Sequence, residues 1–113
     1  MNFIAIDSEE HLKEIQNDTN YTVLLKHNTT CPISKGVLAQ LKTTNNIIEG
    51  IDTIYVLDIL ANRRLSNAIE ETYGITHESP QVLLIRYGAC IYNQHGYKIS
   101  AEDITDALKE NKV

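Results

Sequence analysis

Two cysteines, Cys31 and Cys90, are the side chains of this sequence best suited to nucleophilic or redox chemistry. Polar threonines precede Cys31, Pro32 follows it, and an apolar segment with helical spacing begins directly afterwards. A proline is well tolerated in the first turn of a helix, because its missing N–H would have no partner there. We therefore expect Cys31 to lie at or beside the first residue of a helix, at the carboxyl end of the preceding strand.

The start of a helix is a favourable place for a negatively charged sulfur. Unpaired N–H groups and the positive end of the helix dipole both stabilise the thiolate, which is the nucleophilic form of cysteine. Lys26, His27 and Lys35 add positive or potentially positive groups nearby in the sequence. The alternative, that Cys31 is a small buried hydrophobe, fits poorly with a polar junction between loop and helix. We expect Cys31 to be the catalytic residue.

The remaining cysteine and the histidines are weaker candidates for a nucleophile or for metal ligands. Cys90 lies within an apolar segment, where cysteine normally packs as an inert small hydrophobe. The alternative role, resolving a disulfide formed by Cys31, would need the two sulfurs to approach closely. His11, His77 and His95 are dispersed and lack the spacing of metal ligands, so we interpret them as surface histidines and expect no metal site.

Apolar runs alternate with amphipathic segments along most of the chain. Strands are expected at residues 3–6, 21–25 with an end near His27, 53–59, 81–86 and 89–93. Helices are expected after Ser8, after Cys31, over 62–73 with Gly74 as the stop, and after Ser100, while polar residues around Asn45 and Asn46 form a connection. The order βαβαβαββα predicts the α/β class: a three-layer sandwich whose mixed central sheet has helices on both faces.

Composition narrows the class of protein. A length of 113 residues predicts one domain over residues 1–113, and a net charge of -5 disfavours nucleic acid as a partner. No apolar run approaches the roughly 20 residues of a membrane-spanning helix, and no export signal is visible. Two cysteines are too few for a disulfide-stapled secreted scaffold. We expect a monomer in the cytoplasm.

Two segments of the chain resemble the thioredoxin superfamily. One is Thr30-Cys31-Pro32-Ile33-Ser34 at the start of a helix, and the other is Ser79-Pro80 before a later strand. More narrowly, the KHNTTCPIS and ESPQVLL segments are similar to those of the monothiol bacilliredoxins, the YtxJ-like family. The resemblance implies a thioredoxin-like fold and a thiol-disulfide oxidoreductase that removes bacillithiol from bacillithiolated proteins through Cys31. Bacillithiol would be the co-substrate, and no cofactor would be tightly bound.

The resemblance also implies a substrate-binding role for neighbours of Cys31. Pro80 matches the cis-proline that lies against the active site in the superfamily, and the backbone of Ser79 would then pair with an extended substrate. A trans proline would merely mark the start of a strand. Thr30 could contact the polar groups of a bound thiol or only stabilise the turn, and we favour the first role. Thr30, Pro32 and Ser34 thus join Ser79 and Pro80 as the candidate substrate-binding residues.

Ser34 stands where dithiol members of the superfamily have their second cysteine, so an internal disulfide with Cys31 cannot form. Its hydroxyl could bond the Cys31 sulfur or cap the local backbone, and both options stay open. Two other functions also stay open. One is a protein-interaction module in which Cys31 is dispensable. The other is an iron–sulfur carrier resembling the monothiol glutaredoxins, from whose Cys-Gly-Phe-Ser pattern Pro32 and Ile33 depart.

Overall fold

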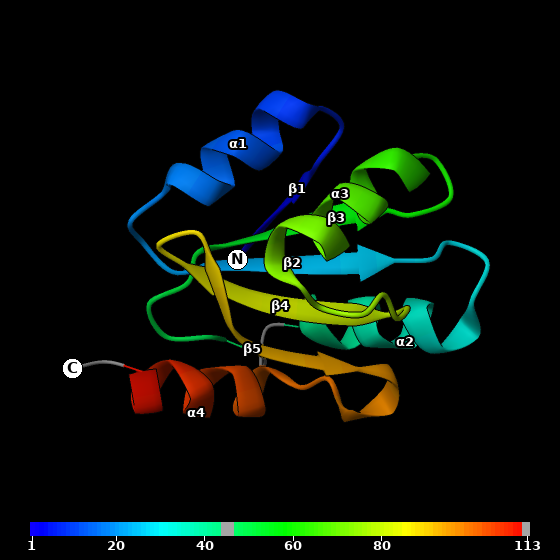
Figure 1. The fold of residues 1–113 in the computed structure, drawn as a ribbon. Helices are drawn as coiled ribbons and strands as arrows, with labels where there is room; N and C mark the ends of the chain where they lie inside the picture. Colours follow the sequence, from blue (N-terminus) through cyan, green and yellow to red (C-terminus); the bar gives the residue numbers. More distant parts are fainter. Residues whose placement is uncertain (44–46, 112–113) are drawn as a thin grey trace.

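A five-stranded sheet forms the centre of the molecule, with helices packed on both of its faces (Figure 1). The computed structural model describes residues 1–43 and 47–111, so the polar stretch around Asn45 and Asn46 lies outside the described residues. The elements along the chain are β1 (Asn2–Ala5), α1 (Glu9–Asn17), β2 (Thr22–His27), α2 (Pro32–Leu41), β3 (Thr53–Asp58), α3 (Arg63–Tyr73), β4 (Gln81–Arg86), β5 (Ala89–His95), η1 (Gly96–Lys98) and α4 (Ala101–Asn111).

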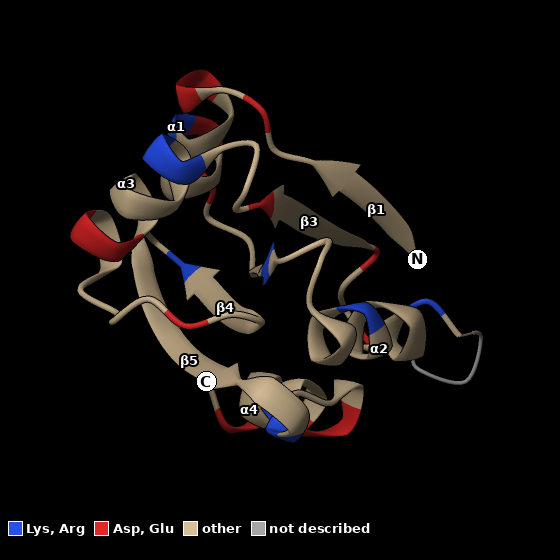
Figure 2. Ribbon diagram, turned by 90° about the vertical axis from the view of Figure 1, so that its right-hand side faces the viewer, with Lys and Arg blue, Asp and Glu red and all other residues tan. Residues whose placement is uncertain are grey.

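The strand order β1-β3-β2-β4-β5 gives a mixed sheet, as the sequence predicts. β1 and β2 both run parallel to β3, whereas β4 is antiparallel to its neighbours β2 and β5. α1 and α3 lie on one side of the sheet, and α2 and α4 lie on the other (Figure 2). Lysine and arginine are scattered over several elements in the same view and form no single basic face there. The thioredoxin-like three-layer sandwich is therefore confirmed.

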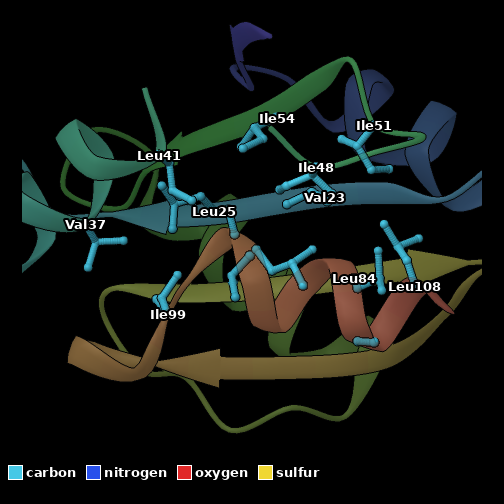
Figure 3. Packing of buried hydrophobic residues seen from close by; sticks show 14 residues of the cluster. Val23, Leu25, Val37, Leu41, Ile48, Ile51, Ile54, Leu84, Ile99 and Leu108 are labelled. Atoms are coloured by element: carbon cyan, nitrogen blue, oxygen red, sulfur yellow. The ribbon is translucent and has the colours of Figure 1, made fainter. Parts of the chain in front are cut away.

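The larger core lies between the sheet and the pair α2 and α4 (Figure 3). β2 contributes Val23 and Leu25, and α2 contributes Val37 and Leu41. Each fully buried side chain of this size contributes roughly 1.5–3 kcal/mol relative to exposure. Packing against β2 therefore holds α2, and with it the Cys31 end of that helix, in a fixed place on the sheet.

A second core fills the opposite layer, beneath α1 and α3. Leu24 of β2 and Leu57 of β3 are fully buried there, together with Ile69 of α3. Side chains alternate between the two faces along a strand. β2 consequently points Val23 and Leu25 towards α2 and α4, and Leu24 towards α1 and α3.

Local sequence signals explain most of the helix ends and the hairpin. The Ser8 and Ser100 hydroxyls accept hydrogen bonds from the N–H groups three residues later, and Gly74 ends α3 with φ of 66°. Tyr87 and Gly88 both have positive φ, which matches the two-residue hairpin turn expected between β4 and β5. None of the described helices is long and apolar enough to cross a membrane.

The structure differs from the expected elements at the end of β5 and beyond. β5 continues past Asn93 to His95, because pairing with Gln81 and Val82 extends the ladder beyond the apolar run. The short helix η1 that follows has no apolar periodicity and was not expected. Both features lie beside the amino end of β4, at the sheet edge where Cys31 is found.

Candidate active site at the sheet edge beside Cys31

The strand register brings four segments to the same edge of the sheet. His27, at the end of β2, lies beside Asp58 at the end of β3. Lys26 pairs with Gln81 at the start of β4, and Gln81 pairs in turn with His95. The segment leading to Cys31 is therefore level with the segment before Gln81 and with the start of η1.

Cys31 is the N-cap residue of α2, with φ of -95° and ψ of 120°, and Pro32 occupies the first turn. Its carbonyl accepts the hydrogen bond of the Lys35 N–H at 3.0 Å, and its side chain caps no backbone group. The residue is half-buried and belongs to neither of the two hydrophobic cores. The N–H groups of Ile33 and Ser34 lie in the first turn, where no intrahelical acceptor exists. Cys31 therefore has the position that the sequence predicts for a reactive thiol.

Asn28 organises the loop before Cys31. Its side-chain Oδ1 accepts hydrogen bonds from the N–H of Thr30 at 2.9 Å and from the Thr30 hydroxyl at 2.8 Å. Its carbonyl accepts the Cys31 N–H at 3.2 Å. Thr30 is exposed, and its hydroxyl is held by Asn28. Asn28 was not among the residues expected at the site, although an Asn two residues before a Thr is typical of an Asx turn.

Ser34 joins this loop to the end of β2. Its hydroxyl accepts the Asn28 N–H at 2.9 Å and lies 2.7 Å from Nδ1 of His27, and the residue is fully buried. Two partners are expected for this hydroxyl from the sequence, the Cys31 sulfur or the local backbone. The structure shows a backbone bond, but to the loop upstream of the helix rather than to the helix start. Ser34 therefore holds in place the loop that carries Cys31.

His27 completes the buried part of the site. Burial lowers the pKa of His27 below its usual range, Asp58 opposes this shift, and the charges of Lys42 and Lys35 reinforce it. The ring is therefore neutral at pH 7, and an unprotonated Nδ1 can accept the Ser34 hydroxyl hydrogen. His27 thus adds a hydrogen-bonding group near Cys31 and no charge.

The expectation that Lys26 adds positive charge beside Cys31 needs correction. Lys26 alternates with His27 along β2, so its side chain lies on the α3 side of the sheet. Its amine donates to the carbonyl of Ser66 in α3 and contacts a ring nitrogen of His77. Of the three basic residues named from the sequence, the exposed Lys35 in the first turn of α2 is the cation on the Cys31 side.

Ser79 and Pro80 lie where the sequence places them, directly before β4. Their peptide bond is cis, and the Pro80 carbonyl accepts the Gly96 N–H at 3.0 Å. The Ser79 hydroxyl oxygen is buried and has no hydrogen-bond partner among the described residues. Because Gln81 pairs with Lys26, these two residues lie beside the segment that follows His27. The structure therefore brings Ser79 and Pro80 together with the Cys31 loop.

Cys90 lies elsewhere. It pairs with Ile85 near the turn, whereas the site edge is marked by the pair Gln81 and His95. At about 3.3 Å per strand residue, Cys90 lies roughly 15 Å along β5 from that edge, beyond the reach of a disulfide with Cys31. Burial raises the pKa of its thiol, although backbone hydrogen bonds at Tyr92 and Leu84 oppose the shift. Cys90 is therefore a packed, protonated thiol.

The three histidines named from the sequence do not behave alike. His95 is exposed, but His11 is half-buried and packs edge-on against Tyr55, with 5.1 Å between ring centroids. His77 is exposed overall, yet its Nδ1 lies 3.1 Å from the Lys26 amine. All three histidines therefore keep some exposure, as expected from the sequence, but His11 also packs against Tyr55 and His77 also contacts Lys26. Over residues 1–43 and 47–111, no group of three or more His, Cys, Asp or Glu side chains is arranged to hold a metal ion.

Comparison with known proteins identifies the relatives of this chain. Residues 4–104 match the family model described as monothiol bacilliredoxin BrxC. A solved structure described as a candidate oxidoreductase with a thioredoxin fold is 27% identical, with a TM-score of 0.82 over 94% of this chain and 93% of that one. The thioredoxin of Malassezia sympodialis is 15% identical, with a TM-score of 0.74 over 97% and 90% of the two chains. The thioredoxin of Trypanosoma brucei brucei, 13% identical, has a TM-score of 0.77 over 96% and 89%.

Proposed function

Since the chain belongs to the monothiol bacilliredoxin family, we propose that it removes bacillithiol from protein mixed disulfides, with Cys31 as the attacking thiolate. The observation that carries this proposal is the place of Cys31 as the half-exposed N-cap of α2. Helix N-termini favour thiolate over thiol, and a thiolate that solvent can reach is the form that attacks disulfides. One similar structure with a thioredoxin fold is described as a candidate oxidoreductase, which supports thiol–disulfide exchange as the class of reaction.

The first step exchanges one disulfide for another. The Cys31 thiolate attacks the bacillithiol sulfur of the mixed disulfide, the old S–S bond breaks, and the substrate protein leaves as a thiolate. A new mixed disulfide then joins Cys31 to bacillithiol. A second thiol, from bacillithiol or a dithiol protein, attacks this bond and releases Cys31 as a thiolate. Each step makes one S–S bond and breaks one, so no external oxidant or cofactor is needed.

The neighbouring residues have distinct parts in this proposal. The Ser79 backbone pairs with the extended substrate, Pro80 closes the site beneath it, and Thr30 and Pro32 form the exposed rim next to the sulfur. Ser34 acts from within, because its hydroxyl holds the loop before Cys31. We place the reaction in the cytoplasm, where thiols are kept reduced.

Intact-mass measurement tests the proposal directly. The wild-type protein and the variants Cys31→Ala and Cys90→Ala are each incubated with bacillithiol disulfide and, separately, with a bacillithiolated protein. We expect a single bacillithiol adduct on the wild type and on Cys90→Ala, and none on Cys31→Ala. Modification of Cys31→Ala at the wild-type rate would contradict the proposal. Full biological activity of Cys31→Ala in cells would favour an interaction module instead.

A further inference from the structure

Lys26 is a charged residue in the most buried strand of the protein. Every residue of β2 is buried, and Lys26 has 0% of its surface exposed. A lysine is almost never fully buried unless its amine has partners. The Lys26 amine donates to the Ser66 carbonyl at 3.2 Å and lies 3.1 Å from Nδ1 of His77. It therefore joins β2 to α3 and to the chain segment that follows α3.

That segment, residues 76–80, is held at several points. The His77 N–H donates to Oε2 of Glu70 at 3.1 Å, and the Ser66 hydroxyl lies 3.3 Å from Nδ1 of His77. The Gln81 side chain donates to the Thr76 carbonyl at 3.0 Å. Among these contacts, the one from the Lys26 amine joins the segment to β2, whereas Gln81 belongs to β4 and Ser66 and Glu70 belong to α3. The segment contains Ser79 and Pro80, which lie beside the Cys31 loop.

Burying the Lys26 amine works against folding. Burial lowers the pKa of its amine, and the charge of Glu70 opposes this shift. A base whose pKa is lower in the folded state disfavours folding at neutral pH, because the unfolded chain holds the proton more readily. Replacing a buried charged group with an apolar side chain of similar size is often neutral or stabilising. A buried amine whose desolvation works against folding, and which holds a segment beside the site, points to a role in function.

We propose that Lys26 is a positioning residue for disulfide exchange at Cys31, because it holds residues 76–80 through His77 so that the Ser79 backbone faces the bound substrate. This inference rests on the proposed function. A lysine ammonium group only donates hydrogen bonds, so His77 can accept one through Nδ1 in the tautomer whose Nε2 carries the ring hydrogen. Without the amine, residues 76–80 keep their bonds to Glu70 of α3 and Gln81 of β4 but lose the side-chain contact that ties them to β2.

The test separates positioning from intrinsic thiol reactivity. Lys26→Met is compared with wild type and with Lys109→Met, which removes an equal charge from the exposed face of α4. Four quantities are measured: alkylation of Cys31 by iodoacetamide, exchange with a bacillithiolated peptide, amide hydrogen exchange of His77 and Glu78, and the free energy of unfolding. For Lys26→Met we expect alkylation within about twofold of wild type and peptide exchange about tenfold slower. We expect amide exchange at least about fivefold faster and a free energy of unfolding equal to or above that of wild type.

A second pair of variants acts on the other partner of this contact. His77 is exposed, so His77→Ala should fold normally, and it should lose peptide exchange to about the same extent as Lys26→Met. His77→Asn restores an acceptor near the position of Nδ1 and should recover exchange to within about threefold of wild type. Lys109→Met should match the wild type in every measurement.

Two results would overturn this inference. One is amide exchange of His77 and Glu78 that is unchanged in Lys26→Met, and the other is peptide exchange within about twofold of wild type in both Lys26→Met and His77→Ala. A wild-type protein that fails to exchange with any bacillithiolated peptide would instead overturn the proposed function. In that case the amide measurement alone decides whether Lys26 holds the segment.

Discussion

Replacing Ser34 with alanine should destabilise the protein far more than the loss of one surface hydroxyl. The Ser34 side chain is fully buried and joins the Asn28 N–H at 2.9 Å to Nδ1 of His27 at 2.7 Å. Alanine removes both hydrogen bonds, and its methyl group can neither donate nor accept a new one. The loop before Cys31 loses its contact with the core at the same time.

The size of the effect follows from the burial of the two partners. A hydrogen bond contributes about 0.5–1.5 kcal/mol, and a buried group left without a partner costs about 1–3 kcal/mol. Asn28 is half-buried, whereas His27 is only 7% exposed. We expect the free energy of unfolding to fall by about 2–3 kcal/mol. For a domain of this length, Tm should fall by roughly 8–15 °C.

Urea denaturation followed by circular dichroism at pH 7 measures this change, and Ser100→Ala is the matched control. The Ser100 hydroxyl accepts the Asp103 N–H at 3.1 Å at the exposed start of α4, so its loss should cost about 1 kcal/mol. If Ser34→Ala loses no more stability than Ser100→Ala, the bond network behind Cys31 is not the support described here.

Burial and backbone geometry lead to four further predictions. Burial lowers the pKa of His27, so the wild type should be most stable above about pH 6.5 and should lose stability as the pH falls towards the folded-state pKa. His27→Gln should lose less stability than the wild type between pH 7.5 and pH 5.5, as measured by urea titrations. Gly36→Ala, in an exposed part of α2 with no atom within 4 Å of the new methyl group, should raise Tm through a gain of about 0.5–1 kcal/mol. Gly88→Ala should lower Tm, since its φ is 73° and the new methyl group would lie 3.3 Å from the Gln16 carbonyl oxygen. Leu57→Ala, at a fully buried position, should cost about 2–5 kcal/mol in the same denaturation assay.

The sequence was sufficient to predict what depends on neighbouring residues. A cysteine before a proline at the start of an apolar helical pattern placed Cys31 at the N-cap, and alternating apolar runs predicted the order of strands and helices. The resemblance to known families placed Ser79 and Pro80 beside Cys31, which no local pattern could do. These predictions depended on propensity, spacing and a shared motif.

The sequence could not show the partners of buried polar groups. Ser34 and His27 are seven positions apart, yet their contact depends on the packing of α2 against β2. Lys26 and His77 meet across 51 positions, and the alternation of β2 decides which face the amine occupies. A lysine inside a strand of apolar residues was a usable signal of burial, but the identity of its partner depended on the register between β2 and β4.

The buried hydroxyl at position 34 and the distant Cys90 mean that Cys31 has no second sulfur of its own chain within reach. Any disulfide made at Cys31 consequently lasts until another molecule collides with it. Its lifetime is then inversely proportional to the concentration of the incoming thiol, and the fraction of the protein held in the oxidised form becomes a measure of how much reducing capacity surrounds it.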